Sequence, residues 1–168
     1  MWSGSAGSRA PHAPRPSGSG VRALLQRVSR AEVRVGERTV GSIGPGLLVL
    51  LGVGHGDEPA TADALARRIC ELRIFEDDQG RTNRSILEVG GEALVVSQFT
   101  LYADTRRGRR PGFTDAAAPD VALGLWRRLA AGIEAQGVRT ALGEFGAEMA
   151  VELVNDGPFT IWLDTADR

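Results

Sequence analysis

Residues 47–53 form a continuously apolar run, and this run constrains the fold more than any other stretch of the chain. A strand with one face in water alternates between apolar and polar residues, whereas a strand covered on both faces does not. The run therefore predicts a strand that is buried on both faces. It follows the break Gly44-Pro45-Gly46, a combination that is typical of turns.

The rest of the chain alternates between strand and helix patterns around this run. Residues 93–101 predict a second buried strand, while apolar positions at spacings of three and four predict helices over 60–73 and 119–136. Shorter patterns predict strands near 21–35, 39–43 and 138–142, and a closing pair from 149 onward. We therefore predict a single α/β domain, in which mixed or antiparallel sheets form a barrel-like core with two main helices outside.

Residues 1–20 differ in composition from the rest of the chain. They contain mainly Gly, Ser, Pro, Ala and Arg and no acidic residue, and such a segment gains too little from burial to offset the entropy of ordering. We predict a disordered tail before a domain spanning 21–168, although a transit peptide also fits. Alternatively, Val21 is the true start, read from a GTG codon, and a native peptide containing residues 1–20 would contradict this.

Composition excludes several classes of protein. The 20 basic and 21 acidic residues nearly cancel, so any nucleic-acid contact must come from a local patch. Cys70 is the only cysteine, which excludes an intrachain disulfide. No apolar run reaches the length of a membrane span, so we expect a soluble, cytoplasmic protein with no membrane partner.

Few side chains are suited to catalysis. The only histidines are His12 and His55, and lysine is absent, so neither a zinc site nor a phosphate-binding Gly-Lys-Ser/Thr loop is expected. No Gly-x-Ser-x-Gly motif accompanies a histidine either. We predict no metal and no cofactor. An enzyme built on this chain would use backbone groups, hydroxyls and the substrate itself.

Polar residues interrupt the second buried strand at its end, in the sequence Ser97-Gln98-Phe99-Thr100-Leu101. A buried hydroxyl or amide without a partner costs about 1–3 kcal/mol in proteins. Their clustering suggests a functional site. The alternative is a strand that simply emerges into solvent.

Two further segments are candidates for binding. Asn155-Asp156-Gly157-Pro158 separates two apolar stretches and could present bare backbone carbonyls to a ligand, although an ordinary hairpin turn is the alternative. A loop with four arginines in five positions could bind phosphate, or could be a solvated run of charge. These arginines are Arg106, Arg107, Arg109 and Arg110.

Together these motifs resemble the D-aminoacyl-tRNA deacylases. The resemblance is carried by Ser97-Gln98-Phe99-Thr100-Leu101, by the basic loop before Pro111 and by the segment from Asn155 to Thr160. Residues 21–28, 44–48 and 72–75 are also similar, and the resemblance extends from 21 to about 164. It implies a homodimeric hydrolase that cleaves the ester between a D-amino acid, or glycine, and the terminal ribose of tRNA, with no DNA partner.

The resemblance also implies roles for individual residues. Gly157 and Pro158 would be joined by a cis bond, enter the partner subunit's pocket and exclude L side chains there. Arg27 would brace this pair. Asn155 and Thr160, which flank the pair, would also belong to the substrate-binding residues.

In the other part of the site, the backbone near Phe99 would receive the scissile carbonyl, beside Ser97 and Gln98. Thr100 would position the ester, with the ribose 2′-OH assisting hydrolysis. Phe145 and Met149 would border the terminal adenine.

Two positions depart from the common pattern of this family. Gly112 stands where Ser often follows Arg-Pro, and Phe159 stands where Val is usual after Gly-Pro; we expect a looser basic loop and an altered pocket wall. A related branch acts on an L-amino acid but lacks the combined Ser-Gln and Gly-Pro motifs. Two other functions stay open: a non-catalytic RNA-binding dimer that uses the arginine loop, and a generic esterase with Thr100 or Ser97 as nucleophile.

Overall fold

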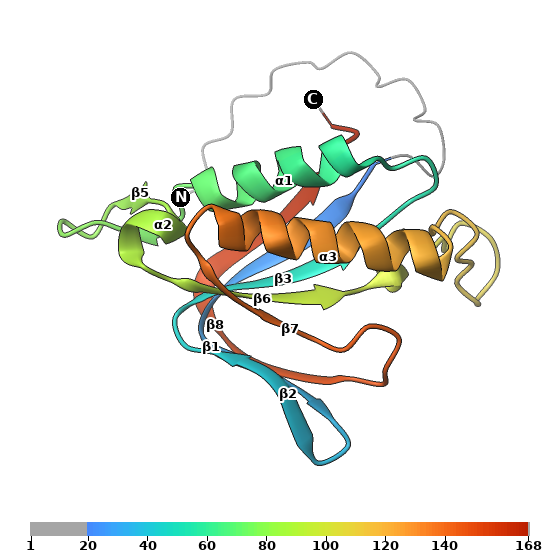
Figure 1. The fold of residues 1–168 in the computed structure, drawn as a ribbon, viewed down its shortest axis with the longest axis horizontal. Coiled ribbons are helices and arrows are strands. Elements are labelled where there is room, and N and C mark those ends of the chain that lie inside the picture. Colours follow the sequence, from blue (N-terminus) through green and yellow to red (C-terminus); the bar gives the residue numbers. More distant parts are fainter. Residues whose placement is uncertain (1–19, 168) are drawn as a thin grey trace.

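The predicted buried run is strand β3 (Gly46–Gly52), which lies inside a six-stranded sheet (Figure 1). The computed structural model describes residues 20–167, so the predictions about residues 1–19, His12 included, lie outside the described residues. Gly20 is buried and donates its backbone N–H to Asp57 Oδ1 at 2.9 Å. The described part of the domain thus begins one residue before Val21.

Strand β1 (Arg22–Val35) organises the antiparallel half of the sheet. It pairs with β2 (Arg38–Ile43), with β3 and with the long C-terminal strand β8 (Ala150–Asp164). On the other side of β3, the strands β6 (Glu92–Ser97) and β7 (Arg139–Leu142) follow in parallel. The sheet is therefore mixed, as predicted.

Two helices make the crossovers that parallel strands require. Helix α1 (Pro59–Glu71) leads from β3 toward β6, and helix α3 (Pro119–Ala135) leads from β6 to β7. They lie side by side over one face of the sheet (Figure 1). Their buried faces, which include Leu65 and Ile69 of α1 and Leu129 and Ile133 of α3, pack in one core with the apolar side chains of β3.

The opposite face of the sheet curls around a second, smaller core. Val28, Ala31 and Val33 of β1 pack there with Leu48 and Leu94. Edge strands β2 and β7 approach so closely that a side chain at Gly41 would collide with the carbonyl of Leu142. The sheet is thus nearly closed, and the predicted barrel-like core with two main outer helices is confirmed.

The predicted end of the second buried strand is wrong, and short elements fill the stretch before that strand. Residues 86–89 form a short helix, α2 (Ile86–Val89), with a capping box between Ser85 and Glu88; it follows the small hairpin of β4 (Phe75–Glu76) and β5 (Thr82–Arg84). Strand β6 ends at Ser97 instead of residue 101, because the chain then turns across the end of β3. That turn is the 3₁₀ helix η1 (Phe99–Tyr102).

Within residues 20–167, no helix is long and apolar enough to span a lipid bilayer.

Cys70 lies in the core on α1, and burial raises the pKa of its thiol to about 11. Because the thiolate is the reactive form, we expect no alkylation of the folded protein by iodoacetamide at pH 8 and complete alkylation in guanidinium chloride. Mass spectrometry of the intact chain measures both. Equal labelling rates in the two conditions would contradict the burial of this thiol.

Candidate functional site

A cavity opens where β3 and β6 end. It has a volume of about 660 Å³ and is lined by Leu51 and Val53 at the end of β3, by Ser97 and Gln98 at the end of β6, and by apolar residues of α3. Ligands of α/β proteins commonly bind outside the carboxyl ends of parallel strands, where loops diverge and the sheet leaves space. The cavity therefore occupies the expected place for a site.

Most of the predicted polar cluster lies at this cavity. Ser97, Gln98 and Phe99 line it, and Phe145 lines it from the β7–β8 loop, with its ring centroid 5.8 Å from that of Trp126. Thr100 is exposed beside the cavity, and its hydroxyl accepts a hydrogen bond from the Gln98 side-chain amide. Met149 is placed elsewhere: it packs with the second core, close to Gly143.

The turn that carries these residues is held by contacts on both sides. The backbone N–H of Gln98 donates to the carbonyl of Leu51 at 2.7 Å. Arg22 Nη1 donates to the carbonyl of Leu101 at 3.0 Å, and its guanidinium lies 4.1 Å from the Tyr102 ring centroid. The sequence analysis missed Arg22, because nothing in the pattern of β1 distinguishes it from the other arginines there.

The wall facing this turn is fixed by backbone pairing and by His55. Gly54 forms a bridge with Ala116, and the N–H of Ala117 donates to the carbonyl of Val53 at 2.9 Å. His55 Nε2 lies 2.7 Å from the carbonyl oxygen of Thr114, which can only accept, so this nitrogen is the donor. His55 thus lines the cavity with its Nε2 proton engaged in a structural hydrogen bond.

The charges around the turn are few. Burial raises the pKa of Asp57, which accepts a hydrogen bond from the N–H of Gly54 at 2.6 Å, and burial also raises the pKa of Tyr102. Among residues 20–167, no three His, Cys, Asp or Glu side chains gather as a metal site would require. The arrangement offers backbone N–H groups, one amide and hydroxyls to a ligand.

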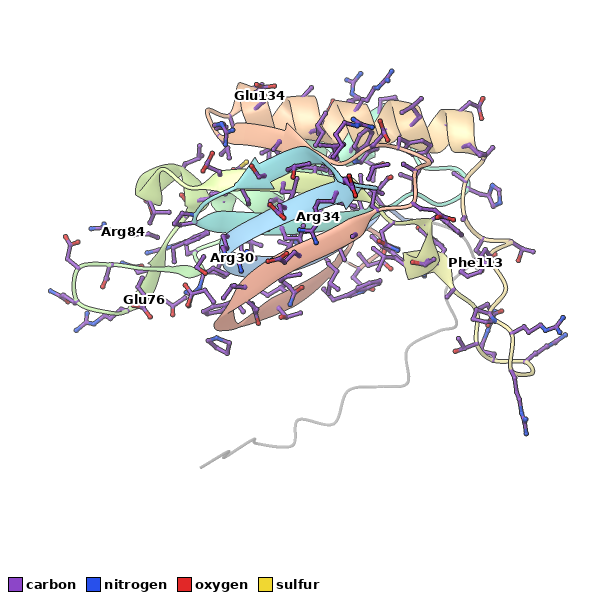
Figure 2. The ribbon with its side chains drawn as sticks, turned by 90° about the horizontal axis from the view of Figure 1, so that it is seen from below. Arg30, Arg34, Glu76, Arg84, Phe113 and Glu134 are labelled. Atoms are coloured by element: carbon purple, nitrogen blue, oxygen red, sulfur yellow. The ribbon has the colours of Figure 1, made fainter. Side chains whose placement is uncertain are left out.

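The basic loop projects from the domain next to the cavity. Its base is closed between Asp104 and Gly112, whose backbone groups exchange hydrogen bonds of 2.8 and 2.9 Å. Figure 2 shows the loop extending away from the fold beside Phe113. A Cβ atom at Gly112 would meet nothing within 4 Å, so the structure gives no sign that glycine loosens the loop at this position.

The arginines of this loop are not equivalent. The guanidinium of Arg106 binds both carboxylate oxygens of Asp104, at 2.8 and 2.7 Å, and thereby lowers the pKa of that carboxyl. Arg107, Arg109 and Arg110 are exposed, and no other residue within 20–167 forms an ion pair with them. These three have charge available for an anionic partner.

The Asn-Asp-Gly-Pro segment is a bulge in the single strand β8, so the predicted closing pair of strands and the alternative of a hairpin turn are both wrong. Both flanks of the segment pair with β1, because Gln26 lies opposite Thr160 and Val28 lies opposite Asn155. Residues 156–159 therefore stand opposite the single residue Arg27. We call residues 156–159 the tip. Within it, Gly157 and Pro158 are exposed and joined by a cis peptide bond.

Arg27 holds the tip from below with a buried guanidinium. Only 4% of the residue is exposed. Its Nε and Nη2 donate to the carbonyls of Asp156 and Gly157, both at 3.1 Å, and its Nη1 donates to the carbonyl of Ile74 at 2.7 Å. The ring of Phe159 lies 4.8 Å from the guanidinium, and Asn155 Nδ2 donates to the carbonyls of Arg27 and Phe159.

The tip lies far from the cavity of its own chain. Arg27 pairs with Leu47 at the start of β3, whereas the cavity begins at Leu51. Four residues along a strand correspond to about 13 Å. None of the tip residues lines the cavity.

Comparison with known proteins places the chain in a family. The family model described as D-Tyr-tRNA(Tyr) deacylase matches residues 24–164. The chain belongs to the D-Tyr-tRNA(Tyr) deacylase family. The predicted resemblance is thereby confirmed, and so is the prediction of an enzyme family, which argues against a purely non-catalytic RNA-binding dimer.

Individual relatives of the family agree in sequence and in fold. A protein named D-aminoacyl-tRNA deacylase from Roseiflexus sp. (strain RS-1) is 60% identical over 146 residues, which are 87% of this chain and 94% of the relative. Another of the same name, from Thermomicrobium roseum, is 58% identical over 88% of this chain and 96% of its own. A solved structure titled c-Myc DNA Unwinding Element Binding Protein matches with a TM-score of 0.79 and 37% identity, over 84% of this chain and 97% of its own.

Replacing Arg27 by Met tests the support of the tip. The substitution removes the donor to three backbone carbonyls, of which that of Ile74 is in a buried contact, so we expect the free energy of unfolding to fall by about 2–4 kcal/mol. Chemical denaturation measures this loss. Arg30→Met is the matched control on β1, because its partner Glu152 is exposed and such pairs contribute at most about 1 kcal/mol. Equal losses for both variants would contradict the buried role of Arg27.

Proposed function

We propose that this member of the family hydrolyses the ester between a D-amino acid, or glycine, and the 3′-terminal ribose of tRNA, and that it acts as a homodimer. One observation supports the dimer above all others: the exposed Gly157-Pro158 pair lies about 13 Å along β3 from the cavity of its own chain. A tip that acts on the ester must therefore reach the cavity of a second copy. The cytoplasm is the location that this function implies.

The proposed chemistry relies on the turn after β6. The backbone N–H groups of the turn at Phe99 and Thr100 stabilise the oxyanion that develops when water attacks the ester. Gln98 and Thr100 are joined by a hydrogen bond and position the ester beside Ser97. The ribose 2′-OH assists proton transfer, which fits a cavity where the one histidine among the described lining residues, His55, is engaged with the carbonyl of Thr114.

Chiral selection comes from the partner's tip in this proposal. The carbonyls of the tip hold the amino group of the substrate. Arg27 donates to one lone pair of the Gly157 carbonyl oxygen and keeps this carbonyl in place, while the second lone pair remains for the substrate. An L side chain would then project into the tip, whereas a D side chain would point away from it. Rejection by collision requires a rigid tip, and the buried guanidinium of Arg27 provides that rigidity.

The activity is tested by incubating D-Tyr-tRNA and L-Tyr-tRNA with the protein and measuring the ester that remains. We expect loss of the D ester only. Loss of both esters would contradict rejection of L side chains, and cleavage of simple amino acid esters at a similar rate would favour a generic esterase. Binding of tRNA without hydrolysis of either ester would favour the alternative function, a non-catalytic RNA-binding dimer.

Mixing two inactive variants tests the exchange of tips between subunits. Gly157-Pro158→Ala-Ala removes the tip, and Gln98→Ala with Thr100→Ala removes the turn. We expect each variant alone to be inactive. Random exchange should restore about a quarter of the wild-type rate, because half of the dimers are mixed and each mixed dimer has one intact site. If mixing restores nothing while co-purification of differently tagged subunits shows mixed dimers, the tip acts within its own chain.

The basic loop is proposed to bind RNA phosphates through Arg107, Arg109, Arg110 and, more weakly, Arg106. Replacing the first three by Gln should raise KM for D-Tyr-tRNA and reduce the slope of log KM against log salt by about 2, since each phosphate contact to a single strand contributes about 0.7. Arg106→Gln is the matched control, because Asp104 already neutralises its charge. If the slope of log KM against log salt is unchanged in the triple variant, the loop is a solvated run of charge that does not contact RNA phosphates.

A further inference from the structure

Two exposed aromatic rings meet at the rim of the cavity, and the chemistry above uses neither side chain. Phe99 is 58% exposed and Phe113 is 37% exposed. Their ring centroids are 5.1 Å apart and the ring planes cross at 71°. We call this pair the rim pair. Its exposure contrasts with the other aromatic pair of the cavity, because Trp126 is buried against the main core.

The rim pair adjoins the base of the basic loop. Phe113 directly follows Gly112, which closes the loop against Asp104, and Figure 2 shows Phe113 where the loop leaves the domain. Aromatic rings next to uncompensated arginines are the combination that binds unpaired nucleic acid: the rings stack on bases and the guanidinium groups attract the phosphates. The charge of Arg107, Arg109 and Arg110 thus indicates what kind of molecule covers the rings.

We propose that the rim pair is a stacking platform for the base of the nucleotide that precedes the ester-bearing terminal nucleoside. This inference rests on the proposed function and extends it to the unpaired 3′ end of the substrate. In the proposed function the reacting ester lies by Ser97 and Gln98. Both residues line the cavity together with Phe99 and Phe113, so an RNA strand that leaves on this side crosses the rim pair.

The geometry of the rim pair assigns different tasks to the two rings. At 71° they cannot both lie parallel to one base. Phe99 is the more exposed ring and offers its face, while Phe113 supports it edge to face. Every base has a π face, so the platform accepts the preceding nucleotide whatever its identity.

The test compares two substrates that differ only in the preceding nucleotides. One is adenosine esterified with D-Tyr, and the other is a short oligonucleotide that ends in CCA and carries the same ester. For Phe113→Leu, we expect KM for the oligonucleotide to rise about tenfold with kcat unchanged, since one stacked base contributes about 1–3 kcal/mol. KM for the adenosine ester should stay the same.

Two further variants separate stacking from structural effects. Phe113→Tyr retains the ring and should restore the KM of the oligonucleotide. Leu87→Ala removes an equally exposed apolar side chain, at 38%, from α2 and should change neither KM. Gel filtration of each variant records whether the dimer persists.

Several results would overturn the platform. An equal rise in KM for both substrates would show that the rings contact the adenosine or the amino acid. Dissociation of the dimer by Phe113→Leu would show that a second copy covers the rings. If the wild-type protein hydrolyses neither substrate, the proposed function fails, and binding of the uncharged oligonucleotide still tests the platform: weaker binding by Phe113→Leu supports it, and equal binding overturns it.

Discussion

A single buried guanidinium connects the parts of this structure that matter most. Arg27 lies where the pairing of β1 with β8 is interrupted, and its three guanidinium nitrogens donate to the carbonyls of Asp156, Gly157 and Ile74. Burial of a charge without partners is costly, so these contacts must form together with the fold. The tip is therefore part of the folded core on its inner side although its outer side is exposed.

The mixed sheet explains why the tip and the cavity are separate. Parallel pairing of β3, β6 and β7 gathers the ends of these strands at one edge, where the cavity forms. Antiparallel pairing of β1 with β8 places the tip opposite the start of β3 instead. A site that needs both elements must then draw them from two chains, which is the physical basis of the proposed dimer.

The cavity itself combines a rigid frame with few reactive groups. Its walls are fixed by backbone hydrogen bonds at Gln98 and Ala117 and by the engaged imidazole of His55. Such a frame suits catalysis by oriented N–H groups, because oriented dipoles need no reorganisation during the reaction. Phe159, one of the departures from the family pattern, stacks beside the guanidinium of Arg27 and packs against the main core, so it contributes to the support of the tip.

The sequence by itself determined the elements whose signals are local. The apolar run in β3 and the periodicity of α1 and α3 predicted these elements, because burial on two faces or on one stripe leaves a direct trace in composition. The polar motifs at the end of β6 and in β8 were recognisable through their resemblance to a known family. Only the tertiary structure decided that residues 156–159 form a bulge and that Met149 lies away from the cavity. It also decided that Arg22 and His55 brace the walls of the cavity. These features depend on contacts between residues far apart in the chain, such as Arg22 with Leu101, and the spacing of residues along one segment carries no record of them.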